Sequence, residues 1–335
     1  MQIISWIIGT LLQWYVWMPI VAVLMFLTWR NYRKIEDFTP VESVLLVLEI
    51  PRTNDKQELA AEQLFASLHG ILRDNKELRL SGGHQEHISF EIASVDGQIR
   101  FYVWVPKTLQ SFVEGQIYSQ YPTVQIHQAD EDYTEHERDH EVAYSTELTL
   151  TTDEFLPIRT FQNFEVDPLA GITGTLAKLE TTGEELWIQV LVRPIPDDWQ
   201  NAADRYINSI KNGRMFSLPG FGGSMQWLIG VLGALWQPPE QGANQSTAVE
   251  LSDRDKTRIS EAEKKATKLG YEVKIRLVYM GESQTNAKLR MQALVGTFKQ
   301  FNSTNLNGFH AVKGAFGKEF IDKYRKRSFI GDGFI

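Results

Sequence analysis

The pattern of hydrophobic positions separates an apolar first segment from a longer part in which polar and apolar residues alternate. Residues 3–29 carry no charged side chain, and a stretch of that length crosses a bilayer as a helix with some tilt. Basic residues follow at Arg30, Arg33 and Lys34, which by the positive-inside rule places the rest of the chain on the cytoplasmic side. The sequence therefore predicts a transmembrane anchor and basic flank over residues 1–35.

A secretory signal peptide is the alternative explanation of this first segment. The apolar run is too long for one, and its basic residues follow the run instead of preceding it. Tryptophans suit membrane interfaces, and a proline within the run is expected to kink the helix. The residues assigned to the anchor are Trp6, Trp14, Trp17, Pro19, Trp29, Arg30, Arg33 and Lys34. The predicted location is the inner (cytoplasmic) membrane, with a single pass and most of the chain in the cytoplasm.

The pattern over residues 40–129 predicts the element order β-α-β-β-α-β. Strands are predicted at residues 41–51, 87–95, 98–106 and 123–129, and amphipathic helices at residues 56–72 and 107–122. Asp96 and Gly97 form a two-residue hairpin signal between the second and third strands. This order is the split βαβ or ferredoxin-like unit, in which two helices cover one face of a four-stranded antiparallel sheet.

A second block, residues 142–312, repeats this order with additions. Strands are predicted near residues 142–151, 186–194 and 271–281, and helices near 168–179, 197–212, 253–269 and 286–302. Asp167 and Ser252 are expected to cap two of these helices, and Gly270 to end one. The predicted fold class is therefore α+β: a transmembrane helix followed by two ferredoxin-like domains with antiparallel sheets. The charged residues 130–141 are expected to form an acidic linker between them.

An apolar insertion interrupts the second block at residues 214–250. It begins with a Gly/Pro-rich turn and contains an apolar stretch, residues 225–236, which is too short to span a bilayer. One interpretation is a buried helical hairpin. The other is a surface segment that docks on the membrane or on another subunit. The residues assigned to such docking are Trp227, Leu228, Ile229, Leu232 and Trp236.

Charge and cysteine content exclude several classes of function. The chain has 34 basic and 42 acidic residues, a net charge of −8, which disfavours a globally basic nucleic-acid binder. It has no cysteine, so disulfides, Cys-ligated zinc, iron–sulfur clusters and thiol nucleophiles are excluded. The C-terminal segment 313–335 is locally basic and leads, we expect, into a further folded element. Its candidate contacts to phosphate or a partner are Lys323, Arg325, Lys326 and Arg327, although a solvated helix face is the commoner explanation.

One motif in the predicted linker matches a zinc peptidase. His136, Glu137 and His140 form an H-E-x-x-H, which on a helix places two imidazoles one turn apart for zinc, with the glutamate as general base. The flanking residues are acidic and offer no apolar face to bury, so little stabilises a helix there. A third ligand is also required, and Glu165 is the best available carboxylate. No phosphate-binding loop or dinucleotide motif is present, and we expect no cofactor.

Five strings together resemble a known family. They are "LAAEQLFASLHGI", "QEHISFEI", "IRFYVWVPKTLQSFVEGQIYSQYP", "IRTFQNFEVDPLAGITGTLAKL" and "ALVGTFKQFNSTNLNGF". Over most of residues 40–335 the chain resembles the membrane-anchored amino-terminal region of bacterial type IV secretion and conjugation-type ATPases. The resemblance implies an assembly that positions a DNA or protein translocase at the inner membrane. The motor with its phosphate-binding loop is absent here, so its ATPase is expected on a downstream continuation or a separate subunit.

Three functions follow from these observations. The preferred one is a non-catalytic anchor and assembly module, with the membrane, a motor ATPase and further copies of the chain as partners. The second is a membrane zinc peptidase that uses His136, His140 and Glu137. The third is a module that guides nucleic acid with the basic C-terminal segment.

Zinc content separates the first two functions. We expect the purified soluble region to contain no stoichiometric zinc by metal analysis, because the H-E-x-x-H lacks a buried helix and a third ligand. Stoichiometric zinc that is lost in the His136→Ala variant would contradict the assembly module and establish the peptidase.

Overall fold

A computed structural model describes most of the chain. The described residues are 17–19, 21–26, 42–51, 59–81, 84–135, 142–179, 183–211 and 251–329, with only the backbone described at 318–320. The chain divides into two compact units, Met1–Glu42 and Ser43–Ile335.

The described residues of the first unit, 17–19 and 21–26, are helical and include Trp17 and Pro19. Their apolar side chains are largely exposed, from 47% at Val21 to 68% at Met25. Among the helices that the structure describes, none is both long enough and apolar enough to cross a membrane. The other residues assigned to the anchor, Trp6, Trp14, Trp29, Arg30, Arg33 and Lys34, lie outside the described residues.

The first half of the second unit follows the predicted order. Its strands are β1 (Ser43–Glu49), β2 (Ile88–Val95), β3 (Gln98–Pro106) and β4 (Gln125–Gln128), arranged as β4-β1-β3-β2. The main helices are α3 (Leu59–Leu68) and α5 (Gln110–Gln120), with a short α4 (Asn75–Leu80). Asp96 and Gly97 adopt positive φ values of 53° and 71° between β2 and β3, which confirms the predicted two-residue hairpin.

The second half has the strand order β6-β7-β5-β8. The strands are β5 (Val142–Leu150), β6 (Glu185–Pro194), β7 (Tyr271–Gly281) and β8 (Phe309–Ala311), with a two-residue β9 (Ala315–Phe316) that also pairs with β5. The helices are α6 (Pro168–Leu176), α7 (Asp198–Lys211), α9 (Asp253–Ala266), α10 (Gln284–Phe298) and α11 (Lys318–Arg325). The predicted caps are present, since the side chains of Asp167 and Ser252 accept hydrogen bonds from Leu169 N and Asp255 N.

The two halves share one sheet. β2 pairs antiparallel with β6, from Ile88 opposite Val192 to Ser94 opposite Leu186, and all the described strand pairs are antiparallel. The predicted α+β class with antiparallel pairing is confirmed, but the prediction of separate sheets is corrected to a single nine-stranded sheet. β2 and β6 would each be an open edge alone, and their pairing removes both edges.

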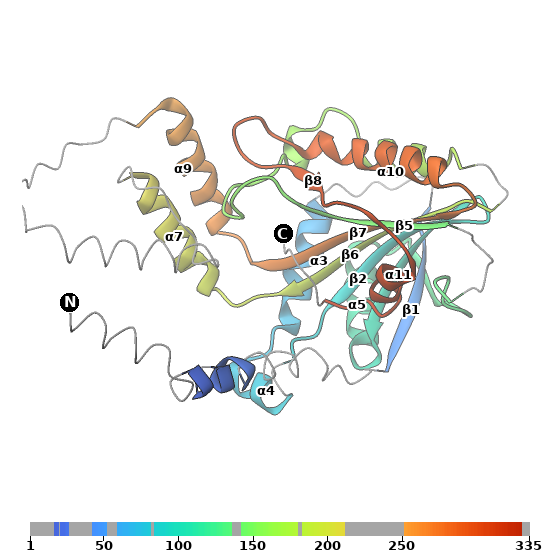
Figure 1. The fold of residues 1–335 in the computed structure, drawn as a ribbon, viewed down its shortest axis with the longest axis horizontal. Coiled ribbons are helices and arrows are strands. Elements are labelled where there is room, and N and C mark those ends of the chain that lie inside the picture. Colours follow the sequence, from blue (N-terminus) through green and yellow to red (C-terminus); the bar gives the residue numbers. More distant parts are fainter. Residues whose placement is uncertain are drawn as a thin grey trace, which may run out of the picture. The chain divides into compact units, whose positions relative to one another are not determined.

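Alternation along the strands gives the sheet two different faces. One face, called here the helical face, carries α3 and α5 over the first half and α6 and α10 over the second. On β6, for example, Leu186 and Ile188 point into this layer, whereas Trp187 points to the opposite face and packs near Tyr324 of α11. In Figure 1, α3 passes behind the strands and α11 lies in front of them. The opposite face, called the second face, is covered by residues 129–135 and α11.

The described parts of the connection between β6 and β7 contain two helices, α7 and α9, whereas a tight turn joins β2 to β3. α7 and α9 lie side by side (Figure 1) and bury Tyr206, Ile207 and Ile259 against Phe155 and Leu156. Gly270 permits the close return into β7, because a Cβ there would lie 2.4 Å from Trp199 Nε1. The insertion 214–250, with Trp227, Leu228, Ile229, Leu232 and Trp236, is outside the part of the chain that the structure describes.

Candidate functional site

Charged and polar side chains are buried on the second face where β2 and β6 meet. We call them the junction cluster: Glu91 of β2, Gln189 of β6, Asp132 and Tyr133 after β4, and Tyr324 and Arg327 at the C-terminal end. Buried polar groups of this kind are stable only when their hydrogen bonds are satisfied, so the partners of each group determine what the cluster can do.

Glu91 is the centre of the junction cluster and only 1% exposed. Its carboxylate accepts hydrogen bonds from Tyr133 OH at 2.8 Å and Gln189 Nε2 at 2.9 Å. Ser89 Oγ donates a further one at 2.7 Å. The remaining donors are Nε and Nη2 of Arg327, both at 3.0 Å, in a bidentate ion pair. The carboxylate is therefore buried with both of its oxygens hydrogen-bonded.

Arg327 joins Glu91 to a second carboxylate. Its guanidinium also contacts both carboxylate oxygens of Asp132, with Nη2 to Oδ1 at 3.1 Å, and it is only 2% exposed. The backbone at Arg327 is left-handed, with φ of 46°, and Ser328 N donates to Lys323 O. This is the Schellman arrangement of a helix C-terminus, and it turns the Arg327 side chain under α11.

Aromatic rings and a histidine surround Arg327. His87 Nε2 donates to Arg327 O at 2.7 Å, and its ring stacks on Trp104 with centroids 5.2 Å apart. Phe329 packs against His87, and the Arg193 guanidinium lies 4.3 Å from the centre of the Phe329 ring. Burial lowers the pKa of His87 to about 4, more than the hydrogen bond to Arg327 O raises it. His87 is therefore neutral at physiological pH.

A second ion pair extends the cluster toward β5 and β7. Arg276 Nε donates to Glu147 Oε1 at 2.8 Å, and its Nη1 reaches Gln189 Oε1 at 3.3 Å and Lys323 O at 3.4 Å. Gln189 Nε2 also donates to Tyr324 O at 3.0 Å. Strands of both halves and the C-terminal helix are thus joined by one continuous set of hydrogen bonds.

The pKa values of Arg327, Asp132, Tyr133 and Tyr324 are all shifted away from neutral pH. Burial alone would lower the pKa of Arg327, but Glu91 and Asp132 raise it well above its ordinary value. Burial opposes ionisation of Asp132 as well, yet the hydrogen bonds and charge of Arg327 lower its pKa. Burial raises the pKa of Tyr133 and Tyr324 well above the usual range. None of these groups is poised to exchange a proton near pH 7, so the arrangement suits a structural clamp better than acid–base chemistry.

The structure places the predicted C-terminal contacts in two environments. Arg327 is buried and its guanidinium is used by Glu91 and Asp132, which corrects the expectation that it contacts phosphate. Lys323 and Arg325 are half-buried, and Lys326 is exposed. Within the described part of the chain, Arg325 Nε is buried without a hydrogen-bond partner.

The zinc ligands expected from the sequence, His136 and His140, and the expected base Glu137 lie outside the described residues. Among the residues that the structure describes, no group of His, Asp and Glu side chains is arranged to hold a metal ion. The preceding residues of the predicted linker are not all solvated, because Tyr133 and Thr134 are buried and Asp132 pairs with Arg327.

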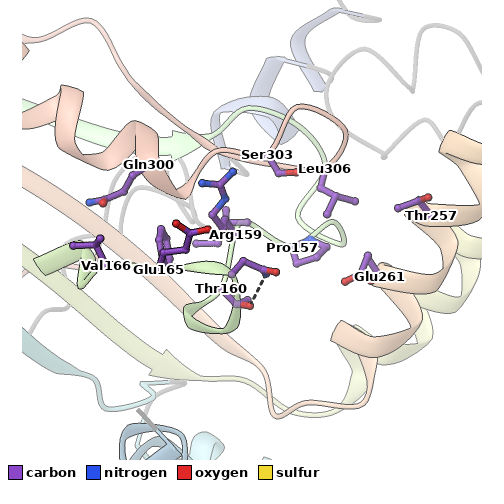
Figure 2. Close-up of a pocket in the computed structure, with 13 residues that line it drawn as sticks. Pro157, Arg159, Thr160, Glu165, Val166, Thr257, Glu261, Gln300, Ser303 and Leu306 are labelled. Carbon is purple, nitrogen blue, oxygen red and sulfur yellow. Dashed lines mark hydrogen bonds between the residues drawn. The ribbon is translucent and has the colours of Figure 1, made fainter. Parts of the chain in front are cut away.

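Glu165 lines an open pocket of about 830 Å³. Figure 2 shows Thr257 and Glu261 of α9 on one side of this pocket and Gln300 on the other. Asn163 Nδ2 donates to Thr160 Oγ1 at 3.3 Å within it. Its lining mixes Arg159 with carboxylates and hydroxyls and includes no histidine, so it has neither a zinc donor set nor a nucleophile with an adjacent base.

Sequence reasoning missed the junction cluster, although a signal was present. Glu91 is the only charged residue within β2, and Gln189 interrupts the apolar run Leu186–Val192. A lone polar residue at an inward position of a strand requires a partner from elsewhere in the fold. The sequence does not identify that partner, because Arg327 is 236 residues away from Glu91.

The fold and the cluster define an α+β protein whose single antiparallel sheet is clamped by its C-terminal helix. The chain belongs to the family described as a domain of unknown function, DUF8128, which matches residues 40–330. This match includes every strand that the structure describes, α11 and Arg327, so the family unit contains the complete junction cluster. The search of curated proteins found no match.

Loss of Arg327 is expected to destabilise the second unit strongly. Arg327→Met leaves the Glu91 carboxylate buried without its cation, and we expect the free energy of unfolding of the full chain to fall by about 3–5 kcal/mol in urea titrations. The double variant Glu91→Gln/Arg327→Met should lose less than the sum of the two single variants. Lys326→Met, one residue away and exposed, is the control, with an effect within about 0.5 kcal/mol. Additive losses would contradict a coupled ion pair.

His87 is expected to make stability fall with acidification. Its pKa in the folded chain, about 4, lies below the ordinary value of 6.5, so the unfolded chain takes up this proton first. The contribution is constant above pH 6.5 and falls by about 3 kcal/mol down to pH 4, since each unit of pKa shift is worth about 1.4 kcal/mol. The His87→Gln side chain can still donate a hydrogen bond but does not titrate. In this variant the proton uptake on unfolding, obtained from the slope of the unfolding free energy against pH, should be smaller by about one proton between pH 4 and 6.5. Parallel curves for the two proteins would contradict this assignment.

Proposed function

We propose that the chain is a non-catalytic, membrane-anchored assembly module of a type IV secretion-like apparatus, with its motor ATPase on another domain or subunit. The observation that carries the proposal is the exposed apolar helix of the first unit. Trp17, Met18, Val21, Val23, Leu24, Met25 and Phe26 are each at least 47% exposed. Apolar side chains gathered in this way are unfavourable in water and favourable in lipid.

Charge supports the direction of insertion. Residues 3–29 have no charged side chain, and the first charged residues after them are Arg30, Arg33 and Lys34. In the proposed topology the basic flank stays on the cytoplasmic side of the inner membrane, and the unit Ser43–Ile335 follows it there.

We propose further that each half of the second unit is a ferredoxin-like domain. The strand order β4-β1-β3-β2 and its counterpart β8-β5-β7-β6 support this, as do two helices on one face of each half. In this interpretation the halves are fused through β2 and β6, and α7 and α9 are an insertion in the second.

The junction cluster supports an assembly role in place of a catalytic one. Its charged groups are buried and pair with one another, which favours a rigid body over a reactive site. A rigid two-part body fixed to the membrane is suited to holding a motor and further copies of itself in register. DNA contact belongs to this proposal only through the end of α11, where Lys326 is exposed and Lys323 and Arg325 are half-buried. The resemblance to type IV secretion ATPases supports the choice of motor.

Cell fractionation tests the anchor. We expect the full chain, expressed in bacteria, to sediment with membranes, to resist high salt and alkaline extraction, and to dissolve in detergent. The variant Trp17→Arg/Met18→Arg should move to the soluble fraction, because each charge near the middle of the apolar segment 3–29 costs about 2.5–3.5 kcal/mol. Lys56→Glu, a charge change outside the anchor, is the matched control.

Two outcomes would contradict the proposal separately. A soluble full chain would overturn the anchor. If the chain is at the membrane but no adjoining coding sequence or co-purifying protein carries a phosphate-binding loop, the motor assignment fails and the anchor stands.

A further inference from the structure

One side of α10 combines exposed polar side chains with residues at the margin of the core. Lys288, Gln292 and Lys299 are exposed there, whereas Met291 is buried and Val295 is partly buried against the core. Lys288, Met291, Gln292, Val295 and Lys299 recur at spacings of three, four, seven and eleven residues, so they form a single stripe along the helix. This stripe is one wall of a groove of about 490 Å³.

The edge of the sheet forms the opposite wall. It consists of Tyr144 and Thr146 of β5 with Ala311 of β8 and Val312 beside it. β8 has only three residues, and the chain leaves the edge before β9 pairs with β5 again at Tyr144 and Ser145. The groove between α10 and this short edge is therefore not covered by a longer strand. Figure 1 shows α10 lying over this end of the sheet beside β8.

The groove has a lysine toward each end of the α10 stripe, with apolar and uncharged polar side chains between them. Its apolar lining residues are Met291, Val295, Ala311 and Val312, and no carboxylate lines it. Among the described residues, no acidic side chain forms an ion pair with Lys288 or Lys299; the Lys288 ammonium lies 5.7 Å from the centre of the Phe316 ring. Large apolar side chains are exposed beside it: Val312 of the lining at 44%, and Phe316, whose ring centroid lies 4.6 Å from that of Tyr144, at 40%.

We propose that this groove docks an acidic, partly apolar peptide segment of a partner protein. Charge complementarity selects the acidic partner, since a cationic groove on a chain of net charge −8 attracts acidic segments where the rest of the surface repels them. Lys288 and Lys299 are eleven residues apart, about 16 Å along the helix axis, so they cannot converge on one phosphate. An extended peptide covers that distance in about five residues. The occupant therefore has two carboxylates about five positions apart, with apolar side chains between them.

This inference does not depend on the anchor or on the motor. The groove lies wholly within the unit Ser43–Ile335. Any partner protein with an acidic, partly apolar segment could therefore be its occupant.

Fluorescence anisotropy with defined peptides tests the proposal. The probe is a labelled peptide of sequence Gly-Glu-Ile-Thr-Val-Thr-Glu-Gly, and the protein is the full chain in nonionic detergent. We expect saturable binding that weakens with added salt, and a loss of affinity of at least about tenfold when both glutamates of the peptide are glutamine. Lys288→Glu/Lys299→Glu in the protein should produce a similar loss, and Val295→Ser a smaller one.

The controls keep the result interpretable. Lys178→Glu changes an exposed lysine at the end of α6 and should leave the affinity unchanged. Thermal unfolding should be the same for the lysine variants, because the substituted lysines are exposed.

Three binding results would overturn the inference. They are equal affinity for the acidic and neutral peptides, no effect of the double lysine variant, and absence of peptide binding with lysine-dependent binding to vesicles of anionic phospholipid. The third would assign the groove to a lipid surface. Concentration-dependent dimerisation of the full chain that requires both lysines, without peptide binding, would assign it to a second copy and would also overturn the proposal.

Discussion

The ion pair between Arg327 and Glu91 is the interaction on which the arrangement of the second unit depends. Removing each ion from water costs several kcal/mol, and attraction compensates only where geometry and hydrogen bonding are nearly complete. Here the compensation needs four separate parts of the chain: β2, β6, the segment after β4 and the end of α11. If any one of these parts moved, a buried charge would lose a partner. The positions of the four parts therefore depend on one another.

The sheet solves a different problem, the exposure of unpaired strand edges. Two four-stranded halves would have four edges, and joining β2 to β6 leaves two. The remaining edges are short, with four residues in β4 and three in β8, which limits uncontrolled pairing with other chains. The apolar layers under α3, α5, α6 and α10 supply the bulk of the stability, at about 1.5–3 kcal/mol for each fully buried large side chain. The polar clamp instead specifies which surfaces meet.

Local signals in the sequence predicted most helices and strands of the fold, but they did not predict which distant segments pair with each other. The Asp96–Gly97 turn, the Asp167 and Ser252 caps and the alternation in β2 and β3 act within a few residues, and each is confirmed. The junction of β2 with β6 joins residues about a hundred positions apart, and the sequence of neither strand identifies the other as its pairing partner. The prediction of a solvated linker was wrong at Asp132 and Tyr133 for the same reason. Their acidic neighbours indicate a linker, but contacts with the distant Arg327 and Glu91 bury them.

The register of the junction has a consequence for symmetry. Seven residue pairs join β2 to β6, and the central one places Glu91 opposite Gln189, with three pairs on either side. The strand orders of the two halves are related by a pseudo-two-fold axis through that pair, as in an isologous dimer. In a true dimer the two central residues would be identical, and two glutamates there would repel each other.

A single chain can place an acid on one side and an amide on the other. An element lying on such an axis can be present only once, and Arg327 with α11 is that element. Because the two halves belong to one chain, a pseudo-symmetric sheet can bind a single C-terminal helix, α11, across its axis.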